Sequence, residues 1–302
     1  MTYAITKPDL AGSNLTGVLW AFLGVGLFGL IYISGRFSGS EISAGQLIWF
    51  RYLGALITML LWIAALPAER AKLRSRQVPV HGLRAMAGGG GGMAAIYAAS
   101  HMSVTGATAI GLLDGLFIII LGVFLLGERF SVKRWAAAAC CLVGAGVVVL
   151  ASGAAALRFE DMLPAGVALL GALLVATESI LIKKLARSEP SVSVLFYVSL
   201  FGAVIFSVPA AISWNSISLG ETGLMLLLGP IALAGQLCNI FAFRRSDAAL
   251  IGPVRYTWII WGALFGWIFF GEIPMPATWG GIALILCGGC YLAFSRNRSP
   301  MS

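Results

Sequence analysis

The sequence predicts an all-α integral membrane protein, with ten transmembrane helices in two inverted five-helix repeats and both termini in the cytoplasm. Three observations support this prediction: the composition, the apolar segments and an internal repeat. Of the 302 residues, 59% are hydrophobic and only 11% are charged, with a mean hydropathy of +0.94. A soluble domain carries about 25% charged residues. Lipid must therefore be the solvent for most of this chain.

Apolar segments account for nearly the whole sequence. About 20 apolar residues cross a bilayer as a helix, and ten such segments follow one another through short connections that leave no room for a soluble domain. They are 15–34, 44–66, 82–100, 104–126, 134–152, 163–183, 191–213, 222–243, 248–270 and 277–294. No small-residue cleavage pattern follows the first segment. We expect it to be a retained helix and not a signal peptide.

The basic residues predict the orientation. With the N-terminus inside, fifteen Lys and Arg residues fall in the inner loops and at the termini, and two fall in the outer loops, at Arg36 and Arg158. The inner set is Lys7, Arg70, Lys72, Arg74, Arg76, Arg129, Lys133, Arg134, Lys183, Lys184, Arg187, Arg244, Arg245, Arg296 and Arg298. This is a strong positive-inside bias. The net charge of +8 therefore indicates topology and not a nucleic-acid partner.

An internal repeat relates the two halves. Residues 97–135 align without a gap with residues 241–279, at a shift of 144 positions. The matches include Gly122 with Gly266, Gly127-Glu128 with Gly271-Glu272, Trp135 with Trp279, Ala139 with Ala283 and Gly144 with Gly288. Five helices per repeat is an odd number, so the second repeat (153–302) is inverted relative to the first (1–152). Inverted repeats around a midplane site are typical of secondary transporters.

Five consecutive glycines, Gly88 to Gly92, lie inside the third apolar segment. A phosphate-binding loop would need a preceding strand and a Gly-Lys-Ser/Thr ending, which are missing. Irregular backbone facing lipid is excluded at membrane depth, so the run must be helical. We expect the bare turn, at Gly90 and Gly91, to lie beside a central cavity and to leave room for substrate or for bending. Close packing against neighbouring helices is the alternative.

The paired Gly-Glu motifs, each followed by a tryptophan, resemble those of the drug/metabolite transporter superfamily in its EamA-type branch. Within that branch the chain is similar to the YddG-type exporters of aromatic amino acids. The resemblance implies export of small metabolites, with aromatic amino acids favoured, across the inner (plasma) membrane of a bacterium. One difference is that the proline common early in the fourth helix of such repeats is replaced by Asp114-Gly115 and Trp258-Ile259.

Four ionisable residues are expected at membrane depth, where a functional role or an internal partner is the default. Asp114 lies near the midplane and is a candidate for binding a substrate ammonium group or a coupling proton; a hydrogen-bonded packing role is the alternative. Arg255 could meet a substrate carboxylate or pair with an acid. Arg51 and Glu178 lie nearer the two interfaces and could reach water there.

Neutral polar and aromatic residues complete the candidate cavity. Gln236 and Asn239 share one helical face and offer donors and acceptors suited to a zwitterion, although bonds between helices are an equal use. Tyr97 and Trp258 are candidates for the cavity wall, and aromatic faces suit aromatic substrates. Glu128 and Glu272 are expected to cap helix ends or pair with loops.

The sequence favours a carrier over other membrane proteins. All five cysteines lie in apolar segments without metal spacing, and the two histidines, His81 and His101, lie near segment ends. We therefore expect no metal, no other cofactor and no enzyme activity. Nothing resembles a nucleotide-binding domain, so no ATPase partner is implied. The two-fold repeat argues against a pore built from a ring of subunits. A broad drug or metabolite exporter, or an importer, is the alternative to aromatic amino acid export.

Overall fold

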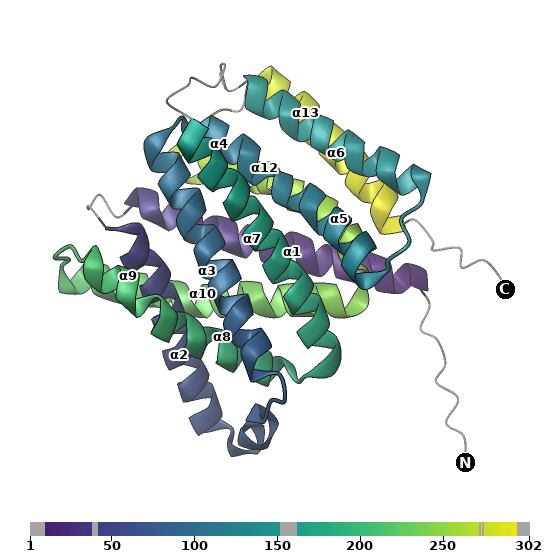
Figure 1. Cartoon of the computed structure of the whole chain (residues 1–302). Coiled ribbons are helices and arrows are strands. Elements are labelled where there is room, and N and C mark those ends of the chain that lie inside the picture. Colours follow the sequence, from purple (N-terminus) through teal and green to yellow (C-terminus); the bar gives the residue numbers. More distant parts are fainter. Residues whose placement is uncertain (1–9, 38–41, 152–161, 272, 274, 295–302) are drawn as a thin grey trace, which may run out of the picture.

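The computed structural model describes residues 10–37, 42–151, 162–271, 273 and 275–294 (Figure 1). Within these ranges the fold is helical and holds no strand. In the first half the elements are α1 (Leu10–Phe37), α2 (Ala44–Ala65), the 3-10 helix η1 (Pro67–Leu73), α3 (Val78–His101), α4 (Val104–Gly111), α5 (Leu113–Leu126) and α6 (Val132–Ala151). In the second half they are α7 (Met162–Ser188), α8 (Ser191–Ile205), α9 (Ser207–Ile212), α10 (Leu219–Arg245), α11 (Ala248–Ile251), the 3-10 helix η3 (Gly252–Thr257), α12 (Trp258–Phe270) and α13 (Pro276–Phe294).

Nine helical stretches of the described residues are long and apolar enough to cross a membrane. They overlap nine of the ten predicted segments. The remaining segment, 82–100, lies in α3, which is 24 residues long. Its five glycines lower its hydropathy, which is why it is not among the nine.

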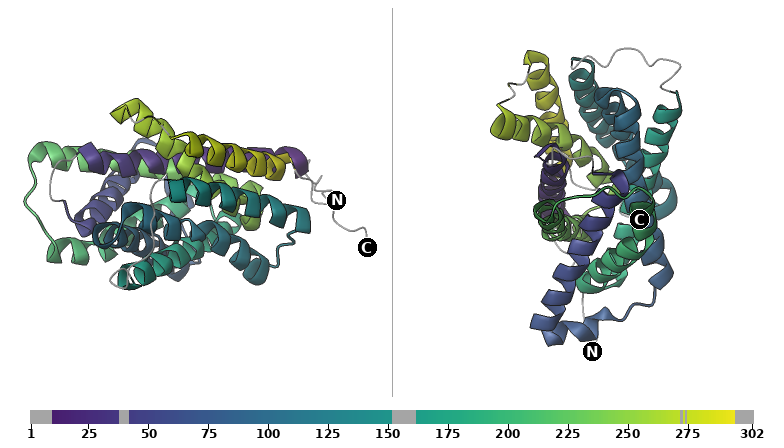
Figure 2. Two further views of the ribbon diagram at one scale, coloured as in Figure 1. Left: turned by 90° about the horizontal axis from the view of Figure 1, so that it is seen from above. Right: turned by 90° about the vertical axis from the view of Figure 1, so that its left-hand side faces the viewer.

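The long helices pair across the two halves. α1 lies along α10, α3 lies along α7, and α6 lies along α13, while α2 packs against both α8 and α10. Figure 1 shows the α6–α13 pair on one side of the molecule. Figure 2 shows the same helices from two further directions. Small residues bring the backbones close: a Cβ added at Gly229 would lie 2.1 Å from the carbonyl carbon of Gly54. This is the close approach that small residues permit in membrane bundles.

The fourth apolar segment of each half is a broken helix. In the first half the break falls between α4 and α5, at Leu112. In the second half α11 gives way to η3, which carries Pro253 in its first turn, and then to α12. The expectation that this half lacks the proline was wrong, because Pro253 lies five residues before Trp258, early in the same segment. A proline removes a backbone donor and breaks the helical ladder at this point.

The Gly-Glu motif has a structural cause. Gly127 and Gly271 end α5 and α12 in the left-handed conformation, with φ of 64° and 66°. Glycine adopts this conformation without steric cost. The carboxylate of Glu128 accepts hydrogen bonds from the backbone N–H groups of Ala248 and Ala249, at 2.8 and 2.7 Å. The predicted capping role of Glu128 is thus confirmed.

Some predicted residues cannot be placed. Glu272, Lys7, Arg158, Arg296 and Arg298 lie outside the described residues, and the side chain of Arg36 is not described.

A polar cluster joins the start of α3 to the turn between α7 and α8. We call it the Glu189 cluster; it comprises Ser75, His81 and Glu189. Ser75 Oγ donates to Glu189 Oε1 at 2.6 Å, and His81 Nε2 lies 3.0 Å from Glu189 Oε2. His81 is fully buried, and its Nδ1 has no hydrogen-bond partner among the described residues. The cluster ties the first half to the second.

Candidate functional site

An ion pair joins the two broken helices. Asp114 lies in the first turn of α5, and Arg255 lies in η3. Arg255 Nε and Nη2 both donate to Asp114 Oδ2, at 2.9 and 2.7 Å. The Asp114 side chain is 8% exposed and that of Arg255 is 27% exposed. Of the two uses predicted for Arg255, the structure shows the pairing with an acid.

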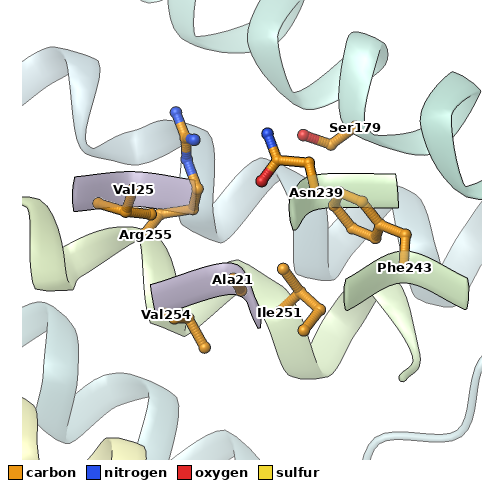
Figure 3. Close-up of a pocket in the computed structure, with 8 residues that line it drawn as sticks. All are labelled: Ala21, Val25, Ser179, Asn239, Phe243, Ile251, Val254 and Arg255. Atoms are coloured by element: carbon orange, nitrogen blue, oxygen red, sulfur yellow. The ribbon is translucent and has the colours of Figure 1, made fainter. Parts of the chain in front are cut away.

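A small cavity, which we call the Arg255 pocket, opens beside this pair. Its lining residues come from α1, α7, α10, α11 and η3: Ala21, Val25, Ser179, Asn239, Phe243, Ile251, Val254 and Arg255. The polar ends of Arg255, Asn239 and Ser179 lie toward one side, whereas Ala21, Ile251 and Val254 lie on the other (Figure 3). The space between these side chains is about 260 Å³, and part of it is open to solvent. Such a cavity presents hydrogen-bonding groups on one wall and an apolar surface on the other.

A second cavity, the Arg51 pocket, lies further along α1 and α10. Its lining residues come from α1, α2, α8 and α10: Phe28, Arg51, Tyr52, Ala55, Val198, Ser199, Ala232, Leu233 and Gln236. The space between these side chains is about 270 Å³, and part of it is open to solvent. Gln236 of this pocket and Asn239 of the Arg255 pocket are neighbours on one face of α10, because residues three apart in a helix are adjacent. The two cavities therefore follow one another along α10.

A buried network stands behind Gln236. Arg84 Nη2 donates to Gln236 Oε1 at 2.7 Å, and Gln236 Nε2 donates to Glu178 Oε1 at 3.2 Å. Arg84 Nε lies 3.8 Å from the same Glu178 oxygen. Arg84 also donates to the carbonyl oxygen of Val194 and is fully buried. The network connects α3, α7, α8 and α10.

Arg84 was not among the ionisable residues expected at membrane depth, although it lies within the predicted segment 82–100. Its position gave a usable signal. Arg84 lies one helical turn before Gly88 and so shares a face with it. A buried cation needs a counter-charge, and a glycine on the same helix face leaves room for one. The carboxyl group of Glu178 occupies this space beside Gly88.

The glycine run packs against several neighbours at once. A Cβ at Gly88 would lie 2.5 Å from the carboxyl carbon of Glu178. At Gly91 it would lie 2.7 Å from Val175, whereas at Gly90 the nearest atom is Leu174 Cδ1 at 3.5 Å. Gly90 and Gly91 thus face α7 and line neither pocket. Their role beside a cavity stays a prediction, and the contacts fit the alternative of close packing.

The predicted aromatic wall is not assembled around the pockets. Tyr97, near the end of α3, stacks on His101 with ring centres 4.1 Å apart and is half exposed. Trp258 begins α12 and packs against the buried cluster that includes Leu112, Tyr256 and Ile259. Neither residue lines the Arg255 pocket or the Arg51 pocket.

Four of the eight predicted site residues are therefore brought together, and four lie elsewhere. Asn239 and Arg255 line the first pocket, Gln236 lines the second, and Asp114 pairs with Arg255. Over the described ranges, no group of three or more His, Cys, Asp or Glu residues is placed to hold a metal ion. What the arrangement offers is a set of paired charges and neutral donors suited to binding a polar organic solute.

Comparison with known proteins gives a consistent result. The family model described as the EamA-like transporter family matches twice, over residues 15–150 and 162–294, and a solute carrier family 35 model matches residues 95–217. The pseudopaline exporter CntI of Pseudomonas aeruginosa is 27% identical over 94% of this chain and 97% of its own length. The S-adenosylmethionine uptake transporter of Rickettsia bellii is 28% identical over 92% of this chain and 95% of its own.

Two further matches are shorter or structural. The riboflavin transporter of Rhizobium johnstonii is 31% identical over 61% of both chains. A solved crystal structure superposes with a TM-score of 0.78 at 22% identity, covering 96% of this chain and 99% of its own. At this identity the superposition concerns the fold alone.

Proposed function

The chain belongs to the EamA-like transporter family, and on this premise we propose that it exports small zwitterionic metabolites by secondary transport. It is an integral, multi-pass membrane transporter of small molecules and not an enzyme. Alternating access between its two halves would carry the solute past the Asp114–Arg255 pair. Aromatic amino acids are the proposed substrates, and the inner membrane of a bacterium is the proposed location.

The proposed topology has ten membrane-crossing helices, in inverted repeats spanning 1–152 and 153–302, with both termini cytoplasmic. The contact pattern supports it. The repeat relates α1 to α7 and α3 to α10, so it exchanges the α1–α10 pair with the α3–α7 pair. The start of α1 and the end of α13 lie at one end of the molecule (Figures 1 and 2). This placement is expected for an even number of crossings.

One observation carries the functional proposal: the Asp114–Arg255 ion pair at the breaks of both fourth helices, beside the Arg255 pocket. Discontinuous helices mark the substrate sites of many transporters. Ionisable residues inside the membrane bundle are costly and mark transport pathways. A pair of opposite charges can exchange partners with the ammonium and carboxylate groups of a zwitterion.

The alternative is an exporter or importer of a different metabolite. The names of the relatives support this alternative, because they include an exporter and an uptake transporter and specify three different solutes.

Reconstituted flux tests the proposal. Purified protein in proteoliposomes is given radiolabelled L-tryptophan, L-phenylalanine, S-adenosylmethionine or riboflavin, with and without an imposed proton gradient and with no ATP. Empty liposomes and the Asp114→Asn variant are the controls. Flux of an aromatic amino acid that the variant loses supports the proposal. Flux of riboflavin or S-adenosylmethionine alone supports the alternative. Absence of all flux overturns the proposed transport of these solutes.

A further inference from the structure

Arg51 is a cation within the bundle that has no carboxylate partner among the residues that the structure describes. It lies on α2 and lines the Arg51 pocket, so it faces inward and does not reach for the lipid headgroups. Among the described residues, Arg84 and Arg255 each face an acid, Glu178 at 3.8 Å and Asp114 at 2.7 Å. No acid of the described chain lies within 4.0 Å of Arg51. Its guanidinium carbon lies 4.7 Å from the centre of the Tyr52 ring.

Tyr52 presents a hydroxyl group whose hydrogen has no acceptor among the described residues, because the Arg51 guanidinium that interacts with the hydroxyl can only donate. The residue is 5% exposed, and no atom of the described chain meets the hydrogen-bond geometry with its Oη. The ring is held by stacking on Phe206, with centres 5.7 Å apart, and by Gly202, where a Cβ would come within 2.3 Å of it. Burying a hydroxyl whose hydrogen has no acceptor is unfavourable. A tyrosine fixed so firmly at this cost points to an absent acceptor.

Gln236 contributes a further donor. Arginine can only donate, so the Gln236 oxygen must face Arg84 and its amide nitrogen must face Glu178. The amide nitrogen carries two hydrogens, and the bond to Glu178 uses one. Because Gln236 lines the Arg51 pocket, its other hydrogen remains for a ligand there.

The charges decide which ligand fits. Among the described residues, Glu178 balances Arg84 and Asp114 balances Arg255, which leaves the positive charge of Arg51 uncompensated at a pocket where Tyr52 and Gln236 can donate. We propose that the Arg51 pocket binds the carboxylate group of the transported solute, with Arg51 as its counter-charge and Tyr52 and Gln236 as hydrogen-bond donors. Arginine and carboxylate form strong, often bidentate pairs. The assignment rests on the proposed function and adds the chemical group that substrates must carry.

Ligand-induced stabilisation tests the assignment. The thermal unfolding midpoint of the purified protein in detergent is measured with L-tryptophan, L-phenylalanine and S-adenosylmethionine. Tryptophanamide and phenylalaninamide, which lack the carboxylate charge, are the matched probes, and riboflavin is a further probe without a carboxylate. We expect at least one carboxylate probe to stabilise the wild type, and its amide to bind at least tenfold more weakly.

The variants isolate each group. Tyr52→Phe removes only the hydroxyl that lacks an acceptor, so it should fold as well as the wild type while its affinity for the carboxylate probe falls about tenfold or more. Arg51→Gln should weaken binding further, and Arg51→Lys should restore part of it. Tyr291→Phe, at an exposed ring on α13, is the matched control and should bind normally.

The outcomes separate this assignment from the proposed transport. It is overturned if no carboxylate probe stabilises the wild type, if the amides bind as tightly as the acids, or if Tyr52→Phe keeps full affinity. Flux measured alongside such a result would leave the transport proposal standing. Carboxylate-dependent binding without flux would support the assignment of the Arg51 pocket and overturn the transport proposal.

Discussion

Replacing Gly88 with alanine should destabilise the protein through Glu178. The added Cβ would lie 2.5–2.7 Å from three atoms of the Glu178 carboxyl group, whereas at Gly90 the nearest atom is 3.5 Å away. Gly90→Ala is therefore a matched control on the same helix. Alanine improves helix propensity by about 1 kcal/mol at either position. This gain cancels when the two variants are compared.

The magnitude follows from what the carboxylate must give up. Displacement breaks its hydrogen bond from Gln236, at 3.2 Å, and its contact with Arg84, at 3.8 Å. A hydrogen bond to a charged group contributes about 1.5–3 kcal/mol, and overpacking costs about 1–3 kcal/mol. The two costs do not add, since moving the carboxylate relieves the overlap. The Glu178 side chain is 13% exposed, so it has some room to move away from the added methyl group. We expect the free energy of unfolding of Gly88→Ala to be about 2 kcal/mol lower than that of Gly90→Ala.

The assay is thermal unfolding in detergent, in the wild-type and Glu178→Ala backgrounds. A difference of about 2 kcal/mol corresponds to a midpoint roughly 4–8 °C lower for Gly88→Ala than for Gly90→Ala. In the Glu178→Ala background the carboxylate is gone, so the two variants should unfold together. Equal midpoints in the wild-type background, or a penalty that persists without Glu178, would refute the reasoning.

Three more predictions concern other parts of the fold. Asp114→Asn or Arg255→Gln alone should cost about 2–4 kcal/mol, because each leaves a charge unpaired, and a double-mutant cycle should show the double variant losing less than the sum. Gly127→Ala should cost about 1–2 kcal/mol, because its φ of 64° is left-handed, whereas Gly146→Ala in α6, where no atom lies within 4 Å of the added Cβ, should raise the unfolding midpoint. In the Glu189 cluster, burial raises the pKa of Glu189, but the hydrogen bonds described above outweigh it and hold that pKa below its usual 4.5. The contribution of Glu189 to the free energy of unfolding is complete above pH 4.5 and is lost as the pH falls through the folded-state pKa. The unfolding midpoint of the wild type should therefore fall with pH over this range, and the Glu189→Gln variant should lose that dependence.

The fold was predictable because lipid imposes a simple rule on the sequence. Every crossing needs a long apolar segment, and each predicted segment coincides with helix. The repeated Gly-Glu signal was also informative, because a helix that ends at a left-handed residue favours glycine there. The break at Leu112 was not predictable, since neither proline nor a polar cluster marks it.

The site was only partly predictable, since a membrane helix is apolar on both its lipid-facing and its packed sides. Periodicity therefore does not reveal which face turns inward. Gly88 and Gly90 look alike in the sequence, yet one meets a carboxylate and the other a leucine. Asp114 was recognised as a buried acid, but its partner is 141 positions away, and no local pattern connects them.

The cap that Glu128 places on α11 has a consequence for synthesis. The carboxylate is made 120 residues before the Ala248 amide that it binds. While the ribosome adds the intervening helices, the first half carries an acceptor whose donors do not yet exist. Lys183, whose Nζ lies 4.0 Å from Glu128 Oε1, is made midway and can hold the carboxylate until then. A nascent chain that stops between residues 183 and 248 therefore lacks both backbone donors, and its Glu128 carboxylate has Lys183 as the partner that holds it.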